Sequence, residues 1–213
     1  MTTVTQVAEY NKTKINWTKV FSVIATLGTT MNGQKDRFDK SDIFEMAISV
    51  FSDGAVEYAN DDGVDHKLTF LKNKEGNPTT QEAKFHSELF YALRSVKRAN
   101  KKKGTPGRKE LVKLNKPVTL KLVNSQGENT HKTLPDSYAE YVLAFDNNSA
   151  FVIETAKLIP YLKFSGDGIE AKKVPADMFT EIVGPNDIAD RKKLDFNYKQ
   201  AKLAFQLNFL NKF

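Results

Sequence analysis

Three aspartates gather in the run DDGVDHKLTF, where Asp61, Asp62 and Asp65 stand close together. Carboxylate oxygens are ligands that Mg²⁺ prefers, and a metal held by them could activate water and stabilise charge on a phosphoryl oxygen. A lysine on a neighbouring strand could complete such a site by orienting the water or neutralising the developing charge, and Lys121 in the run VTLKLV is the candidate. Asp-Asp-Gly is also ordinary turn chemistry, so a solvated turn is the alternative interpretation of the aspartates.

The elements that would position these residues are predicted by hydrophobic periodicity. Apolar residues at helical spacing predict a helix over Asp42–Phe51, which ends at Ser52-Asp53-Gly54. Weak alternation predicts a strand over Val64–Leu71, and a second strand is expected over Val118–Val123. Two further apolar runs, Tyr141–Phe145 and Ala150–Glu154, predict a hairpin closed by Asp146-Asn147-Asn148-Ser149.

A longer helix is predicted between these strands, over residues 79–103. Thr79 and Glu82 have the spacing of a capping box, which satisfies two backbone amides reciprocally. An apolar stripe follows at helical spacing, and Gly104 and Pro106 stop the helix. The stripe consists of Phe85, Leu89, Leu93 and Val96.

Basic residues concentrate in one segment, residues 94–121. This segment holds eleven cations and one anion, whereas 21 cations and 25 anions remain elsewhere, a net charge of −4. A mildly acidic body with one cationic segment suggests a partner with dense negative charge, and nucleic acid, with DNA favoured over RNA, is the expected partner. The expected contacts are Arg94, Lys97, Arg98, Lys101, Lys102, Lys103, Arg108, Lys109 and Lys113.

Composition excludes several other kinds of site. The 213 residues contain no cysteine, which excludes a disulfide scaffold, a thiolate zinc site and a cysteine nucleophile. The three histidines show no ligand spacing, and the short motifs of P-loop, dinucleotide, zincin and nucleophile-elbow enzymes are absent. No signal peptide and no membrane span is visible, so a cytoplasmic protein is expected.

The order of these parts resembles that of the restriction-endonuclease-like nucleases, the PD-(D/E)XK group, over roughly residues 40–160. The pattern of that group is a helix, a strand bearing Asp, and a strand bearing a carboxylate two residues before a Lys. Here the helix would be Asp42–Phe51, the Asp would be Asp65 and the Lys would be Lys121. The run SYAEYVLAFDNNSAFVIE is similar to the paired strands that follow the site in those enzymes.

The resemblance implies a Mg²⁺-dependent DNA endonuclease with Asp65 and Lys121 as catalytic residues. Thr119 stands two residues before Lys121, where the pattern has a carboxylate, so another residue must supply the second metal ligand. Glu57 is the candidate to bind the metal with Asp65, and Glu45 is the next nearest in sequence. The alternative function is a non-catalytic DNA- or RNA-binding accessory protein, for example a phage-encoded single-strand-binding or regulatory protein.

The expected architecture is one α+β or α/β domain, a mixed β-sheet flanked by helices. Residues 1–14 are expected to be a flexible N-terminus, 15–185 the core domain, and 186–213 a C-terminal helical element. Alternating apolar residues from Leu203 to Phe209 also allow a strand in this element. The segment Ile15–Leu27 suits either a strand or a short helix, and Ala176–Ile182 is expected to be a short helix. Apolar residues on more than one side of the C-terminal element suggest packing on the core or on a second subunit, and hence a homodimer. A third function, docking of the basic segment on an acidic protein, also fits this architecture.

Overall fold

The computed structural model describes residues 15–30, 40–61, 63–86, 88–96, 108–124, 133–165 and 168–188. Its first two elements are the helices α2 (Trp17–Thr30) and α3 (Lys40–Val50). Asn16 caps α2, because its side-chain oxygen accepts a hydrogen bond from the backbone N–H of Lys19 at 3.1 Å. The segment that suited either a strand or a helix is therefore a helix, and α3 confirms the helix predicted over Asp42–Phe51.

Six strands form one sheet behind these helices. In spatial order they are β1 (Val56–Asp61), β2 (Val64–Lys72), β3 (Pro78–Phe85), β7 (Tyr141–Phe145), β8 (Ala150–Glu154) and β11 (Thr180–Val183). The β3–β7 pair is parallel and each of the other pairs is antiparallel. The predicted α+β domain with a mixed sheet is confirmed, as is the β7–β8 hairpin.

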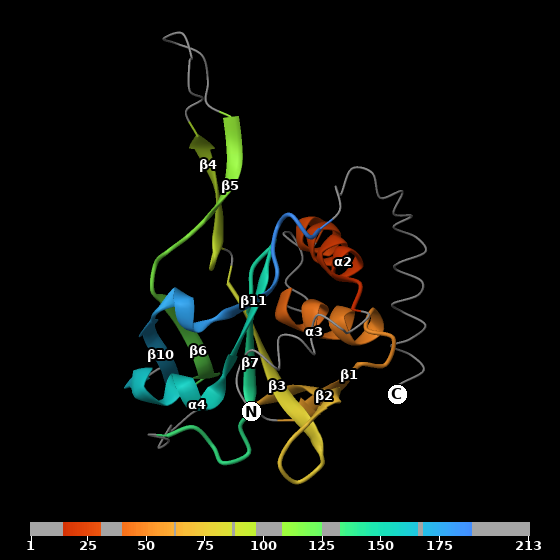
Figure 1. Ribbon diagram of the computed structural model, residues 1–213, viewed down its shortest axis with the longest axis vertical. Helices are drawn as coiled ribbons and strands as arrows, with labels where there is room; N and C mark the ends of the chain where they lie inside the picture. Colours follow the sequence, from red (N-terminus) through yellow and green to blue (C-terminus); the bar gives the residue numbers. More distant parts are fainter. Residues whose placement is uncertain are drawn as a thin grey trace.

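A second, smaller sheet covers the other face of the first. Its spatial order is β6 (Val118–Asn124), β10 (Gly168–Val174) and β9 (Leu162–Ser165). The short helix α4 (Thr155–Leu158) and the 3₁₀ turns η1 (Ile159–Tyr161) and η2 (Ala176–Met178) connect the strands at this side. Figure 1 shows α2 and α3 on one side of the large sheet, and β6 and β10 on the other. The helix expected over Ala176–Ile182 is wrong beyond η2, because the chain there extends to pair with β8 as β11.

Two hydrophobic cores result from this three-layer arrangement. The core between the helices and the large sheet includes Phe21, Phe44 and Phe145, all of them fully buried. The core between the two sheets includes Phe90 and Phe151, whose rings stack with their centroids 3.7 Å apart. The large sheet is therefore covered on both faces, and a polar side chain on either face must find a partner or a solvent opening.

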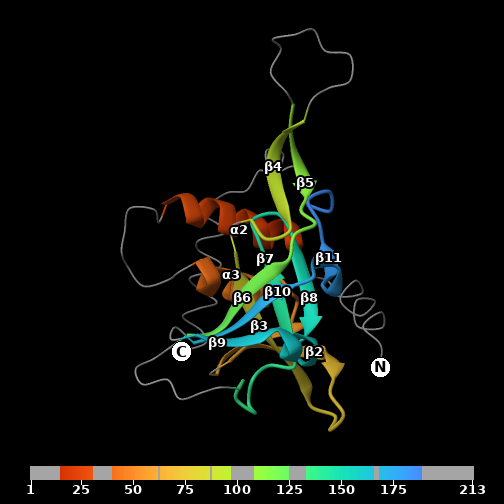
Figure 2. The same cartoon turned by 90° about the vertical axis from the view of Figure 1, so that its left-hand side faces the viewer.

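The helix predicted over residues 79–103 is wrong over its described part, residues 79–86 and 88–96. The chain forms strand β3 there and then strand β4 (Tyr91–Val96), which pairs with β5 (Arg108–Lys113). β3 is a central strand with backbone partners on both sides, β2 and β7, and this pairing outweighs the helix propensity of Gln, Glu, Ala and Lys. The two-stranded β4–β5 ribbon projects away from the layered body, as Figures 1 and 2 show from two directions.

Several predictions fall outside this description. Residues 1–14 and 189–213 lie outside the described residues, so the flexible N-terminus and the C-terminal helical element stay predictions, as does the homodimer. Among the described helices, none has the length and apolar character needed to cross a membrane.

Candidate functional site

One face of the large sheet carries three ionisable side chains from two neighbouring strands. Asp65 lies on β2, and Glu82 and Lys84 lie on β3. Side chains alternate along a strand, so Glu82 and Lys84, two residues apart, point to the same face. The β2–β3 register pairs His66 with Gln81, and one residue further it sets Asp65 opposite Glu82. A carboxylate of one strand therefore stands beside a carboxylate and a lysine of the next.

Direct contacts hold these three side chains in place. The carboxylate of Asp65 accepts a hydrogen bond from the backbone N–H of Ala83, with 2.6 Å between Oδ2 and N. The Lys84 ammonium forms an ion pair with the Glu82 carboxylate. Glu82 is only 5% exposed, whereas the Lys84 side chain is 25% exposed. The lysine thus links a buried carboxylate to the surface.

Tyr138 lies near enough to these carboxylates for their charges to act on it. Its hydroxyl donates to the backbone carbonyl of Leu122 on β6 at 3.4 Å. Burial raises the pKa of Tyr138 far above its ordinary value, and the negative charges of Glu82 and Asp65 raise it further. Gly63, just before β2, has a φ of +79°, and a Cβ there would lie 2.9 Å from the tyrosine ring. The tyrosine is therefore a neutral, closely fitted wall at this face.

The contacts of a buried histidine on β2 show to which face of the sheet Asp65 points. The Nε2–H of His66 donates to the backbone carbonyl of Glu45 on α3 at 2.9 Å, and its Nδ1 accepts from the Gln81 amide at 3.2 Å. Complete burial lowers the pKa of His66 to about 4, although the bond to Glu45 raises it in part, so the ring is neutral at pH 7. Because His66 points to α3, its neighbour Asp65 points to the other face, away from the helix that carries Glu45.

The second predicted metal ligand, Glu57, lies on β1 and is exposed. Its partner across the β1–β2 ladder is Lys67, two residues from Asp65. Cross-strand partners share a face, so Glu57, Lys67 and Asp65 lie on the same side of the sheet. The structure therefore brings Glu57 to the face of Asp65, at a diagonal position.

Lys121, the predicted catalytic lysine, lies in the other sheet. It is exposed on β6, while its neighbours Leu120 and Leu122 are buried in the core between the two sheets. Alternation along β6 therefore directs Lys121 away from that core, and its ladder partner is Glu170 on β10. Lys121 and Asp65 therefore lie on strands of different sheets, and their shared site stays a prediction.

The donors of the β2–β3 face are of the chemical type that a hard metal ion takes. Within the described ranges, no group of three or more His, Cys, Asp or Glu side chains is arranged to hold a metal. Mg²⁺ is commonly held by only one or two carboxylates, because water and substrate phosphates complete its shell. Asp65 and Glu82 supply that number of carboxylates, and the donors are all oxygens. These residues are therefore a candidate Mg²⁺ site in the presence of a phosphate-bearing substrate.

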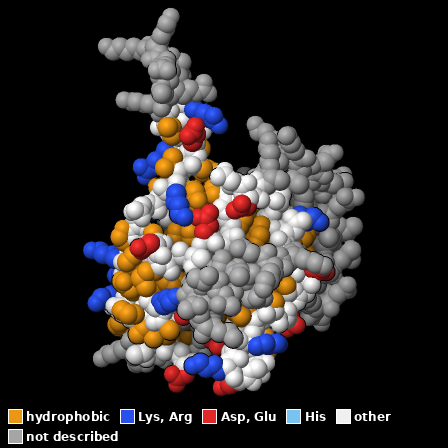
Figure 3. All heavy atoms as spheres, viewed as in Figure 1, with side chains coloured by type: hydrophobic (Ala, Val, Ile, Leu, Met, Phe, Trp, Pro, Cys, Tyr) orange, Lys and Arg blue, Asp and Glu red, His pale blue; other side chains and the backbone are white. Residues whose placement is uncertain are grey.

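Some of the predicted nucleic-acid contacts lie on the β4–β5 ribbon, and the others lie outside the residues that the structure describes. Arg94 lies on β4, while Arg108, Lys109 and Lys113 lie on β5, all with exposed side chains. Figure 3 shows basic and hydrophobic side chains along this projecting part of the surface. The remaining predicted contacts lie outside the described residues, namely Lys97, Arg98, Lys101, Lys102 and Lys103.

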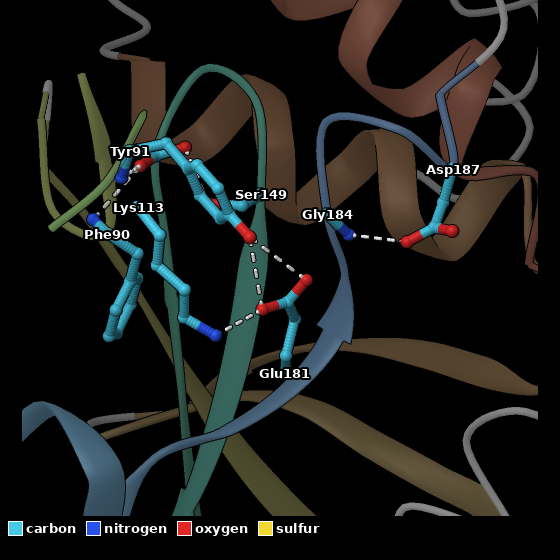
Figure 4. Close-up of polar contacts among 8 residues, drawn as sticks. Phe90, Tyr91, Lys113, Ser149, Glu181, Gly184 and Asp187 are labelled. Atoms are coloured by element: carbon cyan, nitrogen blue, oxygen red, sulfur yellow. Dashed lines mark hydrogen bonds and ion pairs between the residues drawn. The ribbon is translucent and has the colours of Figure 1, made fainter. Parts of the chain in front are cut away.

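Two carboxylates anchor the base of the ribbon. Buried Asp146, in the β7–β8 turn, accepts hydrogen bonds from the backbone N–H groups of Phe90 and Tyr91 at 3.1 and 3.2 Å. Glu181 on β11 accepts from the Tyr91 hydroxyl at 3.3 Å and pairs with the Lys113 ammonium at 2.7 Å (Figure 4). Tyr91 and Lys113 are cross-strand partners, so Glu181 holds both strands of the ribbon. Lys113 therefore has a structural role in addition to its predicted one.

Glu82 and Lys84 were not predicted as site residues, because the spacing of Thr79 and Glu82 is typical of a capping box and both residues fall within the predicted helix. The signal that could have identified them is the run Glu82-Ala83-Lys84, a carboxylate two residues before a lysine. The run follows the turn that closes the Asp65 strand, as expected of the next strand in a hairpin.

No protein-family model, curated protein or solved structure matches this chain. Its function must therefore be inferred from the β2–β3 face and the β4–β5 ribbon.

Proposed function

We propose that this protein is a nucleic-acid-binding enzyme, a Mg²⁺-dependent DNA endonuclease that hydrolyses phosphodiesters. The observation that carries the proposal is the grouping of Asp65 with Glu82 and Lys84 on adjacent strands of one sheet face. Two carboxylates with a lysine suit phosphoryl chemistry, because the carboxylates can hold a divalent ion while the lysine offers positive charge to the reacting phosphate.

This grouping supports the resemblance to the PD-(D/E)XK nucleases in a form different from the one predicted. The helix α3 precedes β2 with Asp65, and β3 carries Glu82-Ala83-Lys84 directly beside it. The carboxylate that Thr119 could not supply two residues before Lys121 is thus available as Glu82 two residues before Lys84. We therefore assign the catalytic lysine to Lys84 and the metal ligands to Asp65 and Glu82.

The chemistry of the site follows from how its side chains are held. A bound Mg²⁺ would lower the pKa of a water and stabilise charge on the phosphate oxygens. The backbone N–H of Ala83 fixes the Asp65 carboxylate, and Lys84 neutralises the buried charge of Glu82. When a phosphate approaches, the Lys84 ammonium is placed to orient the attacking water or stabilise the developing negative charge. Tyr138 closes one side of the site with a neutral ring, which limits water there.

The proposed substrate is DNA, bound through the basic ribbon and the segment that joins its strands. Four cations and one anion lie on the described strands of the ribbon, and phosphate contacts by such cations make affinity fall with salt. Two further expectations belong to the same proposal, a cytoplasmic location and a homodimer. A dimer would bring two sites to the two strands of a duplex.

A non-catalytic DNA- or RNA-binding accessory protein is the second candidate. The ribbon cations support binding whether or not the β2–β3 face is catalytic. The Glu82–Lys84 ion pair would then serve only to stabilise a buried carboxylate.

Supercoiled plasmid incubated with the purified protein tests the proposal. Nicked or linear product should appear with Mg²⁺ and be absent with EDTA. Glu82→Gln keeps the size of the side chain but removes its charge, and should abolish the product. Glu75→Gln is the matched control, because Glu75 is an exposed carboxylate in the turn between β2 and β3, and this variant should cut at the parental rate. A shifted plasmid band without product, with or without Mg²⁺, would instead support the accessory-protein function.

A further inference from the structure

The β4–β5 ribbon is a separate two-stranded antiparallel sheet. Six residues of each strand pair in register, from Tyr91 opposite Lys113 to Val96 opposite Arg108. Two paired strands are about 5 Å apart, and six residues extend about 20 Å. Figures 1 and 2 show the ribbon extending away from the two packed sheets.

The two faces of the ribbon carry different side chains. One face presents Arg94 opposite Glu110, with Arg108 beside them, and the Arg108 Nε lies 3.3 Å from a Glu110 carboxylate oxygen. The other face presents Leu93 opposite Leu111, which are 59% and 38% exposed, together with Lys109 and Lys113. The first face therefore offers the donors of two arginines and one acceptor, the carboxylate that Arg108 contacts.

The direction of the ribbon is fixed at its base. A two-stranded hairpin alone is only marginally stable in water. Here Asp146 holds the start of β4, and Glu181 holds Tyr91 and Lys113, which face each other at the first pair. Figure 4 shows Glu181 reaching the two side chains from β11. A ribbon anchored in this way can insert into a partner without first being ordered.

The base of the ribbon also lies near the candidate site. Lys84 on β3 pairs with Ala144 on β7, two residues before Asp146. Two strand residues span about 7 Å, so the anchor and the lysine share the same end of the sheet. A single duplex could therefore contact the ribbon and the β2–β3 face together.

We infer that the β4–β5 ribbon enters the major groove of double-stranded DNA and presents Arg94, Glu110 and Arg108 to the base edges. This inference rests on the proposed function in taking nucleic acid as the partner, and it names the substrate as duplex DNA. The major groove of B-DNA is about 12 Å wide and admits a two-stranded ribbon, whereas the minor groove is only about 6 Å wide. The major groove of double-stranded RNA is too deep and narrow for side chains to read. The cationic excess of the ribbon complements the phosphates that line the groove.

The chemistry of the presented face predicts which bases it contacts. Arginine donates two hydrogen bonds to O6 and N7 of guanine, and glutamate accepts from N4 of cytosine. A face with Arg94 across from Glu110 and Arg108 two residues along the same strand should therefore favour G·C pairs.

Methylation interference shows directly which groove of the DNA the protein contacts. The experiment is done in EDTA, where cleavage is absent. Dimethyl sulfate methylates N7 of guanine in the major groove and N3 of adenine in the minor groove of a radiolabelled mixed-sequence duplex. Bound duplex should be depleted of molecules methylated at guanine N7 and unchanged in adenine N3 methylation. Depletion at adenine N3, or depletion at neither position, would overturn the inference. A 20-base-pair RNA duplex should bind at least about tenfold more weakly than DNA of the same sequence, and equal binding would also overturn it.

Two matched double variants test whether Arg94 and Arg108 contact the bases. Arg94→Gln with Arg108→Gln should weaken duplex binding at least about tenfold and abolish the guanine N7 interference. Lys74→Gln with Lys163→Gln removes the same charge from exposed positions outside the ribbon and should retain the interference. If both pairs reduce binding equally and keep the interference, the arginines do not read bases and the inference fails. Cleavage in Mg²⁺ reports separately on the proposed function, because Mg²⁺-dependent cutting without interference defeats only the ribbon inference. Interference without cutting defeats only the nuclease assignment.

Discussion

The carboxylate of Asp65 on β2 accepts a hydrogen bond from the backbone N–H of Ala83 on β3, with 2.6 Å between the two atoms. Ala83 lies between Glu82 and Lys84, so this bond ties the aspartate to the strand segment that carries the other two ionisable groups. The relative placement of the three side chains is therefore set by backbone pairing. Strands position such groups more accurately than loops do.

Asp65→Asn should remove the negative charge of this side chain while keeping its size and its hydrogen bond to Ala83. The asparagine side-chain oxygen can still accept the Ala83 N–H, so the free energy of unfolding should change by less than about 1 kcal/mol. Cleavage should be lost, because one metal-binding carboxylate is removed. Binding to DNA in EDTA should be unchanged or tighter, since a negative charge facing the phosphates is gone. Urea unfolding, a plasmid assay and a gel shift measure these three quantities, and parental cleavage by this variant would remove Asp65 from the site.

His66 should make the protein less stable in mild acid. Its pKa is about 4 in the folded protein against about 6.5 when unfolded, so the unfolded chain binds more protons between these values. The stabilisation is fully present above about pH 6.5 and is lost as the pH falls toward 4. About 2 kcal/mol should be lost between pH 7 and pH 5. Chemical unfolding at both pH values measures this, and His66→Gln should show a smaller loss because it cannot titrate.

Asp146→Ala should destabilise the protein by about 3 kcal/mol, because it leaves buried backbone donors without an acceptor. The carboxylate accepts from the N–H groups of Phe90, Tyr91 and Asn148 and from the Ser149 hydroxyl. Ser149→Ala is the control, since it removes a single one of these donors and should cost only about 1 kcal/mol. Equal losses in urea unfolding would show that Asp146 does not anchor the ribbon.

Glu181→Gln should loosen the ribbon without unfolding the body. The change weakens the hold on both Tyr91 and Lys113, so backbone amides of β4 and β5 should exchange with deuterium several-fold faster. Amides of α3 should be unaffected. Glu170→Gln removes the carboxylate of a comparable ion pair, with Lys172 on β10, and should leave ribbon exchange unchanged. Unchanged exchange in Glu181→Gln would contradict the anchoring role.

Much of the fold was predictable because local patterns and tertiary pairing agree. The helix ending near Phe51 and the β7–β8 hairpin both have strong local signals, a turn with glycine in one case and an Asp-Asn-Asn-Ser loop in the other. The strand at Val118–Val123 was predicted for the same reason, since its alternating residues Val118, Leu120 and Leu122 face the core.

The region after Thr79 was not predictable in this way. Its residues favour a helix locally, and Thr79 with Glu82 imitates a cap, yet β3 lies between two partner strands. Buried polar groups here are satisfied by distant partners, as when Gln81 donates to His66. The candidate site was missed with the strand, because Glu82 and Lys84 share a face only when the backbone is extended.

A paired comparison of Lys84→Met with Lys121→Met tests most directly whether Lys84 on β3 is the catalytic lysine. Both variants lose one ammonium and keep an unbranched side chain, so their effect on overall charge is the same. The initial rate of plasmid cleavage in Mg²⁺ should fall at least about 100-fold in Lys84→Met, a loss typical of removing one stabilising group from a transition state. Lys121→Met, with its exposed side chain on the other sheet, should cleave within about twofold of the parent. The reverse result, loss in Lys121→Met with parental rate in Lys84→Met, would contradict the assignment.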